Sequence, residues 1–98
     1  MMKQIYWQFL DEIEGVSEYV NSAVRCEEKN SSMASTYMDM AKTEVGHAEK
    51  LLAMMREIAE KKDSDKSDMD GKWGAADILI DVMSGQLVKA RAMVKSFE

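Results

Sequence analysis

The sequence contains no proline, one cysteine and only 5 glycines in 98 residues. A single cysteine, Cys26, cannot form an internal disulfide, so a scaffold stapled by its own disulfides is excluded and we expect a cytoplasmic protein. Hydrophobic residues make up 46% of the chain and charged residues 32%, and the hydrophobic ones are weighted toward Met, Ala, Leu and Val. This composition is typical of an all-α protein that forms one small domain, or one part of an oligomer's core.

The chain also lacks an excess of basic residues and a long apolar run. Its formal net charge is −5, which argues against nucleic acid or an anionic membrane as a partner, because both bind basic surfaces. No apolar run approaches the roughly 20 residues of a membrane-spanning helix. The opening segment MMKQIYWQFLDE lacks the apolar core of a signal peptide. We therefore predict neither a nucleic-acid partner nor a membrane partner.

Two breaks divide the helical pattern. The stretch EEKNSS (27–32) carries an asparagine and two serines, which favour a helix end followed by a new N-cap. The stretch KKDSDKSDMDGKWG (61–74) is charged and punctuated by glycine, as loops are. We predict a single domain over 1–98, with helices near 3–28, 32–61 and 73–97 and a charged loop over 62–72.

The helix predicted over 32–61 has two neighbouring apolar rows. In the first row Glu44 and His47, one turn apart, are the only charged or titratable side chains apart from the phenol of Tyr37. Alternating steps of 4 and 3 residues predict that this row forms the seam of a helical bundle. The first row is Met33, Tyr37, Met40, Glu44, His47, Leu51, Met54 and Ile58, and the second is Ala34, Met38, Ala41, Val45, Ala48, Leu52, Met55 and Ala59.

The other two predicted helices also carry apolar rows. In the helix over 3–28 one row has Glu12 as its only carboxylate, and a second row, already half polar, contains Glu14. A further row of this helix, through Gln4, Gln8, Asp11 and Gly15, reads as its solvent face. The apolar rows are Ile5, Phe9, Glu12, Val16, Tyr19, Ala23 and Cys26 in the first helix, and Trp73, Ala76, Ile80, Met83, Leu87, Ala90, Val94 and Phe97 in the third.

Glu44 and His47 have the chemistry of metal ligands. At i and i+3 their side chains lie on one helical face and can converge on one point. A carboxylate with an imidazole suits iron, manganese or zinc, and an ionised carboxylate in an apolar seam is costly unless it is paired or binds a metal. An antiparallel hairpin that closes near residues 29–31 brings Glu12 and Glu14 to the same level. Either of these two could supply a third ligand.

One chain then carries half of a dinuclear site. Di-iron bundles use a Glu from each of two helices and a Glu-x-x-His from each of two others. A two-fold homodimer, or a larger even-numbered oligomer, would complete both a four-helix bundle and the site at the subunit interface. The predicted metal ligands are Glu12, Glu44 and His47, with Glu14 as the alternative to Glu12.

The segments DEIEGVSEY (11–19) and EVGHAEKL (44–51) resemble the ferritin-like superfamily, and most closely its short, half-bundle encapsulated ferritins. The resemblance covers the first two predicted helices, roughly 55 residues, and the third helix is longer than the family pattern. It implies that Glu12, Glu44 and His47 are ferroxidase ligands and that Tyr19 is a catalytic tyrosine near the metals. It places Asp11 and Glu14 among the acids of an entry site.

The activity that the resemblance implies is oxidation of Fe(II) by oxygen or peroxide at a site for two iron ions per dimer interface, with manganese or zinc as other possible metals. His47 would bind as neutral imidazole, so metal affinity should fall on acidification. An alternative hypothesis is that the chain is a structural or interaction module. Its buried Glu–His pair would then set the helix register and bind no metal. A rubrerythrin-type peroxide reductase is disfavoured because a Cys-x-x-Cys module is missing.

Overall fold

Three long helices make up the computed structural model, α1 (Met2–Cys26), α2 (Ser31–Ser64) and α3 (Lys72–Phe97). The structure describes the backbone of residues 1–64 and 72–98 and the side chains of 1–61 and 76–98, and this part of the chain contains no strand. The predicted all-α class is confirmed. Our prediction of a loop over 62–72 is wrong at both ends, because α2 runs through 62–64 and α3 begins at Lys72. The middle of that predicted loop, 65–71, lies outside the described residues.

The turn between α1 and α2 is short because an asparagine caps the second helix. The side-chain Oδ1 of Asn30 accepts a hydrogen bond from the backbone N–H of Met33 at 3.0 Å. A side-chain oxygen three residues before the donor is the standard N-cap arrangement and satisfies one of the free N–H groups of the first turn. The backbone N–H of Asn30 in turn donates to the carbonyl of Cys26 at 2.7 Å. The chain therefore reverses within four residues, and α2 runs antiparallel to α1.

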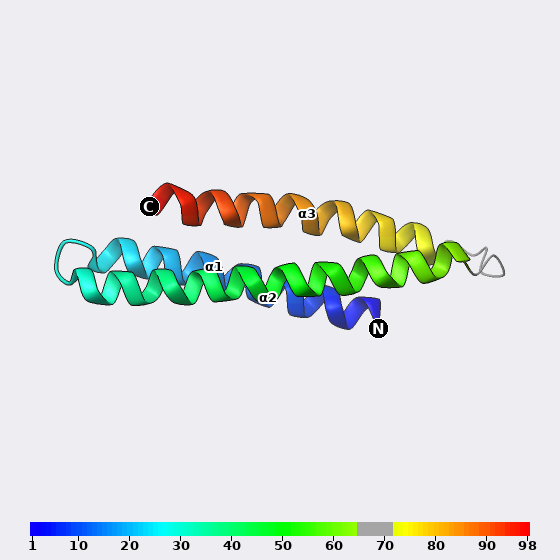
Figure 1. Cartoon of the computed structure of the whole chain (residues 1–98), viewed down its shortest axis with the longest axis horizontal. Helices are drawn as coiled ribbons and strands as arrows, with labels where there is room; N and C mark the ends of the chain where they lie inside the picture. The colour runs from blue at the N-terminus through cyan, green and yellow to red at the C-terminus, as the bar shows by residue number, and fades with distance from the viewer. Residues whose placement is uncertain (65–71) are drawn as a thin grey trace.

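The three helices lie side by side in an elongated bundle of 59 × 18 × 15 Å. In Figure 1, α3 returns along the α1–α2 hairpin and ends near the turn that joins those two helices. Polar contacts link α2 to α3 and to Glu98, the residue after α3. Arg91 pairs with Glu49 at 2.6 Å, Lys42 pairs with Glu98 at 2.9 Å, and Arg56 donates a hydrogen bond to Ser84 at 3.4 Å. The hydrogen bond to Glu98 and the negative charge of Glu98 raise the pKa of Lys42. All three contacts are exposed and contribute little to stability.

The core lies where the three helices meet and has two halves along the bundle. The row predicted for the first helix is buried, and so is the row predicted for the third helix over 76–97, with Glu12, Tyr19, Cys26, Ile80 and Phe97 partly exposed. The side chain of Trp73, the first residue of the third row, lies outside the described residues. Phe9, Val16, Met55 and Met83 are the largest fully buried side chains. One half is Val16, Val20, Ala23, Ala34, Met38, Ala41, Ala90 and Val94, and the other is Ile5, Phe9, Ala48, Leu52, Met55, Met83 and Leu87.

The row of α2 that we predicted as the bundle seam is not the buried row of this chain. Met33, Met40, His47 and Met54 are exposed, whereas the neighbouring row carries the core. That neighbouring row contains Ala34, Ala41 and Ala48, all buried. Small side chains let packed helices approach closely, because the distance between two helix axes depends on the side chains at the contact. The longer side chains of the first row are left on the outside of the three-helix unit.

None of the helices in the described parts of the chain is long and apolar enough to cross a membrane.

A matched pair of valines on α1 tests the position of the core. Val16 is fully buried and Val24 is 55% exposed. Val16→Ala should lower the free energy of unfolding by about 2 kcal/mol, because it loses buried methyl groups and leaves a cavity. Val24→Ala should change it by less than about 0.5 kcal/mol. Urea denaturation of the two variants measures the difference, and equal losses would contradict this packing.

Candidate metal centre

Glu12 on α1 and Glu44 and His47 on α2 come together halfway along the hairpin. One ligand atom from each of the three residues can be chosen so that all lie within 4.8 Å of one another. Glu44 and His47 are one turn apart on α2, so their side chains leave the same face of that helix. The antiparallel turn at Asn30 sets Glu12 at their level. This is the grouping that the sequence pattern predicted.

The two distances from His47 to the glutamates are those between ligands of one ion. The imidazole Nδ1 of His47 lies 3.4 Å from Oε2 of Glu12 and 3.9 Å from Oε2 of Glu44. Zinc binds nitrogen and carboxylate oxygen at roughly 2.0–2.2 Å, so two atoms bonded to one such ion lie no more than about 4.4 Å apart. Both measured distances satisfy this limit.

Burial differs between the three side chains. The Glu12 and Glu44 side chains are each 24% exposed, whereas the His47 side chain is 50% exposed. The Oε2 atom of Glu12 is itself buried and has no hydrogen-bond partner among the described residues. A buried carboxylate oxygen without a donor is costly. A cation placed between Glu12, Glu44 and His47 would satisfy that oxygen, so the residues present fit a metal ion of the type bound by carboxylate and imidazole.

Gly15 has no side chain, which leaves room for the Glu44 side chain to pack against α1. A Cβ atom at Gly15 would lie 3.4 Å from both Cγ and Cδ of Glu44 and 3.6 Å from its Oε2. These are ordinary van der Waals separations, so an alanine would just fill the space and a larger side chain would displace the carboxylate. Our assignment of the row through Gly15 to the solvent face is wrong at this residue, which is half-buried and faces α2.

An open hollow of ≈330 Å³ lies beside two of the three ligands, Glu12 and His47. It is lined by residues of α1 and α2 alone, which are Gln8, Glu12, His47, Lys50 and Leu51. The hollow connects the buried edge of Glu12 with solvent. A small ion or molecule can therefore reach the ligand group from outside the three-helix unit.

The other residues singled out in the sequence lie outside the ligand group. Glu14 and Asp11 are exposed on α1, and of the two candidates for the third ligand the group includes Glu12. Tyr19 stacks on Tyr37 with the ring centroids 6.2 Å apart. Tyr19 is seven residues from Glu12, about 10 Å along the helix axis. It does not contact the ligands directly in the single chain.

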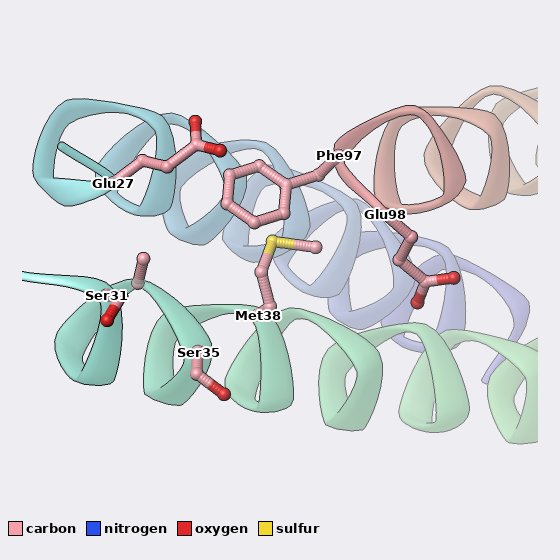
Figure 2. Close-up of a pocket in the computed structure, with 7 residues that line it drawn as sticks. Glu27, Ser31, Ser35, Met38, Phe97 and Glu98 are labelled. Carbon is pink, nitrogen blue, oxygen red and sulfur yellow. The ribbon is translucent and has the colours of Figure 1, made fainter.

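A second, larger hollow lies at the end of the bundle that holds the α1–α2 turn. It measures ≈440 Å³ and is lined by residues of α2, by Phe97 of α3, by Glu98 directly after α3 and by Glu27 of the turn. Figure 2 shows the ring of Phe97 beside Met38, with the carboxylates of Glu27 and Glu98 on either side. These two carboxylates do not belong to the candidate metal group. The hollow is separate from the site formed by Glu12, Glu44 and His47.

The sequence pattern did not indicate the roles of Gly15, Gln8 and Lys50. For Gly15 the sequence did contain one indication of a close contact. A glycine inside a helix costs about 1 kcal/mol relative to alanine, which often marks a close approach of another group. Gly15 also lies opposite Glu44 in the same antiparallel register that places Glu12 near His47. Gln8 and Lys50 carried no such signal, because polar residues on an exposed helical face are ordinary.

No family model, curated protein or solved structure matches this chain. The resemblance to ferritin-like proteins therefore stays a prediction from the sequence segments themselves.

Substitutions at Gly15 test the packing of Glu44. Gly15→Ala should leave Glu44 in place and raise the free energy of unfolding by roughly 0.5–1 kcal/mol, because alanine is the better helix former. Gly15→Leu should push the carboxylate away and weaken Zn²⁺ binding by about tenfold to a hundredfold, the usual effect of disturbing a ligand's support. Zn²⁺ titration calorimetry of both variants measures this. Equal affinities in the alanine and leucine variants would contradict the close approach.

Proposed function

We propose that this chain is a metal-binding, ferritin-like protein in which two copies form an interfacial site for two iron ions and oxidise Fe(II). The observation that carries the proposal is the convergence of Glu12, Glu44 and His47 around a buried carboxylate oxygen that has no hydrogen-bond donor among the described residues. Two carboxylates offset the charge of one divalent cation. The imidazole adds a nitrogen ligand typical of iron, manganese and zinc sites.

The need for a second copy follows from ligand number and from exposure. One chain supplies a Glu and a Glu-x-x-His, which is half of the set used by di-iron bundle proteins. His47 is half exposed, and Met33, Met40 and Met54 of the same α2 row are exposed around it. A two-fold partner on this face would cover those methionines and bring a second ligand set to the first. This supports a four-helix core built from α1 and α2 of two copies.

The residues of the chain have distinct tasks in this proposal. Glu12 and Glu44 bind the cations and stabilise the additional positive charge that develops on oxidation. His47 binds as neutral imidazole. Fe(II) is the substrate: two Fe(II) ions give two electrons to dioxygen, which takes up two protons and becomes hydrogen peroxide. In the single chain, the hollow lined by Gln8 and Lys50 gives Fe(II) access to Glu12 and His47.

One observation favours the alternative, a structural or interaction module without metal. A protonated His47 at 3.4 Å from Glu12 would form an ion pair across the α1–α2 hairpin. Such a pair would help to set the helix register without binding a ligand. The half-exposed imidazole makes the pair weak, since exposed ion pairs contribute at most about 1 kcal/mol. The two functions differ in what happens when metal is added.

Metal loading separates the two functions. After anaerobic loading with Fe(II), the native protein should retain one ion per chain, and its free energy of unfolding should rise by about 2.7 kcal/mol at a free metal concentration 100-fold above the Kd. Glu44→Ala/His47→Ala should retain no ion and gain no stability. Glu57→Ala, which removes an exposed carboxylate of the same helix, is the control and should behave as the native protein.

Air is then admitted, and the rate of Fe(III) formation is followed by absorbance. The native protein and Glu57→Ala should oxidise Fe(II) faster than the double variant. A native protein that holds no iron, manganese or zinc after loading would overturn the metal proposal and leave the structural alternative.

Association through the ligand face is tested at Met40, which is exposed one turn from Glu44. Met40→Glu adds an uncompensated charge where the partner would pack and should shift the protein toward smaller species in sedimentation equilibrium. The fold of the single chain should persist, because Met40 lies outside its core. Fe(II) oxidation should fall with association. Unchanged association in Met40→Glu would contradict a dimer across this face.

A further inference from the structure

α3 is apolar on two opposite faces, and only one of them packs on the rest of the chain. Its inner face is the buried row from Ala76 to Val94. Its outer face, a half-turn away, carries side chains that are mostly apolar or small. Ile78 is 64% and Val88 62% exposed. The outer face of α3 consists of Ile78, Val82, Gly85, Val88 and Ala92, all exposed.

A contiguous apolar helical face is normally covered, either by the same chain or by a partner. Four of the ten exposed large hydrophobic side chains in the described part of the chain lie on α3, and three of these four are on its outer face. In the middle of that face, a Cβ at Gly85 would meet nothing within 4 Å. The glycine is therefore not explained by packing within the chain, although it costs the helix about 1 kcal/mol. It would let the backbone of another helix approach closely.

We propose that the outer face of α3 binds the same face of a second copy, antiparallel, with the two-fold axis at Gly85. Residues at equal distances on either side of Gly85 then lie at the same level on the two helices. Ile78 lies at the level of the partner's Ala92, and a large side chain meets a small one. Asp81 lies at the level of the partner's Lys89. Both are exposed and both flank the outer face.

The distribution of charge along α3 favours a second copy as the partner and an antiparallel arrangement of the two helices. Acidic Asp77 and Asp81 lie in the first half of α3, and basic Lys89 and Lys95 lie in the second half, all exposed. An antiparallel pair sets the acidic half of each helix against the basic half of the other. A parallel pair would set like charges together, which costs free energy. A strongly acidic or strongly basic partner would be complementary to only one half of the face.

This surface is separate from the ligand face. The candidate metal site and its hollow are built from α1 and α2, whereas the outer face belongs to α3. The inference therefore does not rest on metal binding. Together with a dimer across the ligand face, a second two-fold contact through α3 would join dimers into assemblies larger than two chains.

A charge exchange tests the contact in the full chain. Asp81→Lys places like charges at two symmetric positions and should weaken association by about tenfold, since each exposed pair is worth up to about 1 kcal/mol and tenfold corresponds to about 1.4 kcal/mol. Asp81→Lys/Lys89→Asp exchanges the two charges and should restore the native association constant. Sedimentation equilibrium over a range of concentrations measures all three proteins, and circular dichroism checks that each is folded. The proposal would be overturned if Asp81→Lys and the native protein had equal association constants, or if the double variant did not recover the native value.

Gly85→Glu should change two measured quantities, the stability of the single chain and the association constant, in opposite directions. Replacing an exposed mid-helix glycine should preserve or increase the stability of the single chain, because glycine is a poor helix former. Association should fall, because the new carboxylates face each other across the two-fold axis. Unchanged association in this variant would also overturn the proposal.

The two self-contacts are told apart in the Met40→Glu background. The α3 contact should persist there and should still respond to Asp81→Lys. Absence of metal binding in the native protein, together with a surviving charge-exchange effect, would refute the proposed function alone. Retained metal binding without a charge-exchange effect would refute the α3 contact alone.

Discussion

The register of the α1–α2 hairpin is the constraint on which the candidate site depends. Asn30 caps α2 and closes a short turn, and two stiff helices leave that turn in opposite directions. Each contact farther along is then set by residue count. Glu12 lies against His47, and Gly15 lies against Glu44. A slip of one helical turn would move these partners about 5.4 Å apart and separate the ligands.

The third helix decides which face of the hairpin becomes the core. α3 packs on the alanine-rich row of α2, where small side chains allow close approach, and its own buried row closes the core from the other side. The carboxylates and the imidazole are thereby left at the edge of the core, partly buried and open to solvent. Full burial would impose the desolvation cost of two carboxylates, and full exposure would leave them hydrated and mobile. The intermediate position keeps one oxygen of Glu12 without a hydrogen-bond donor among the described residues, while a hollow gives access to Glu12.

Much of this arrangement could be predicted because helices have a strict period. The apolar rows of α1 and α3 follow from residue spacing. The convergence of a glutamate of α1, either Glu12 or Glu14, with Glu44 and His47 follows from spacing and a short antiparallel turn. The buried row of α2 did not follow. Two adjacent rows of that helix are both apolar, and periodicity does not tell which one faces the neighbouring helices. Gly15 was misassigned for a related reason, since its row is otherwise polar and the single residue that touches Glu44 has no side chain to mark it.

The sequence by itself determined the all-helical class, the position of the turn after Cys26 and the three residue types that can bind a metal, because each depends on local preference and spacing. The tertiary structure alone decided that Glu12 belongs to the ligand group while Glu14 points to solvent. It also decided that the face carrying His47 is open in the single chain and that α3 keeps an uncovered apolar face. These outcomes depend on how closely three helices approach and rotate about their axes, and side-chain volumes at the contacts set that approach.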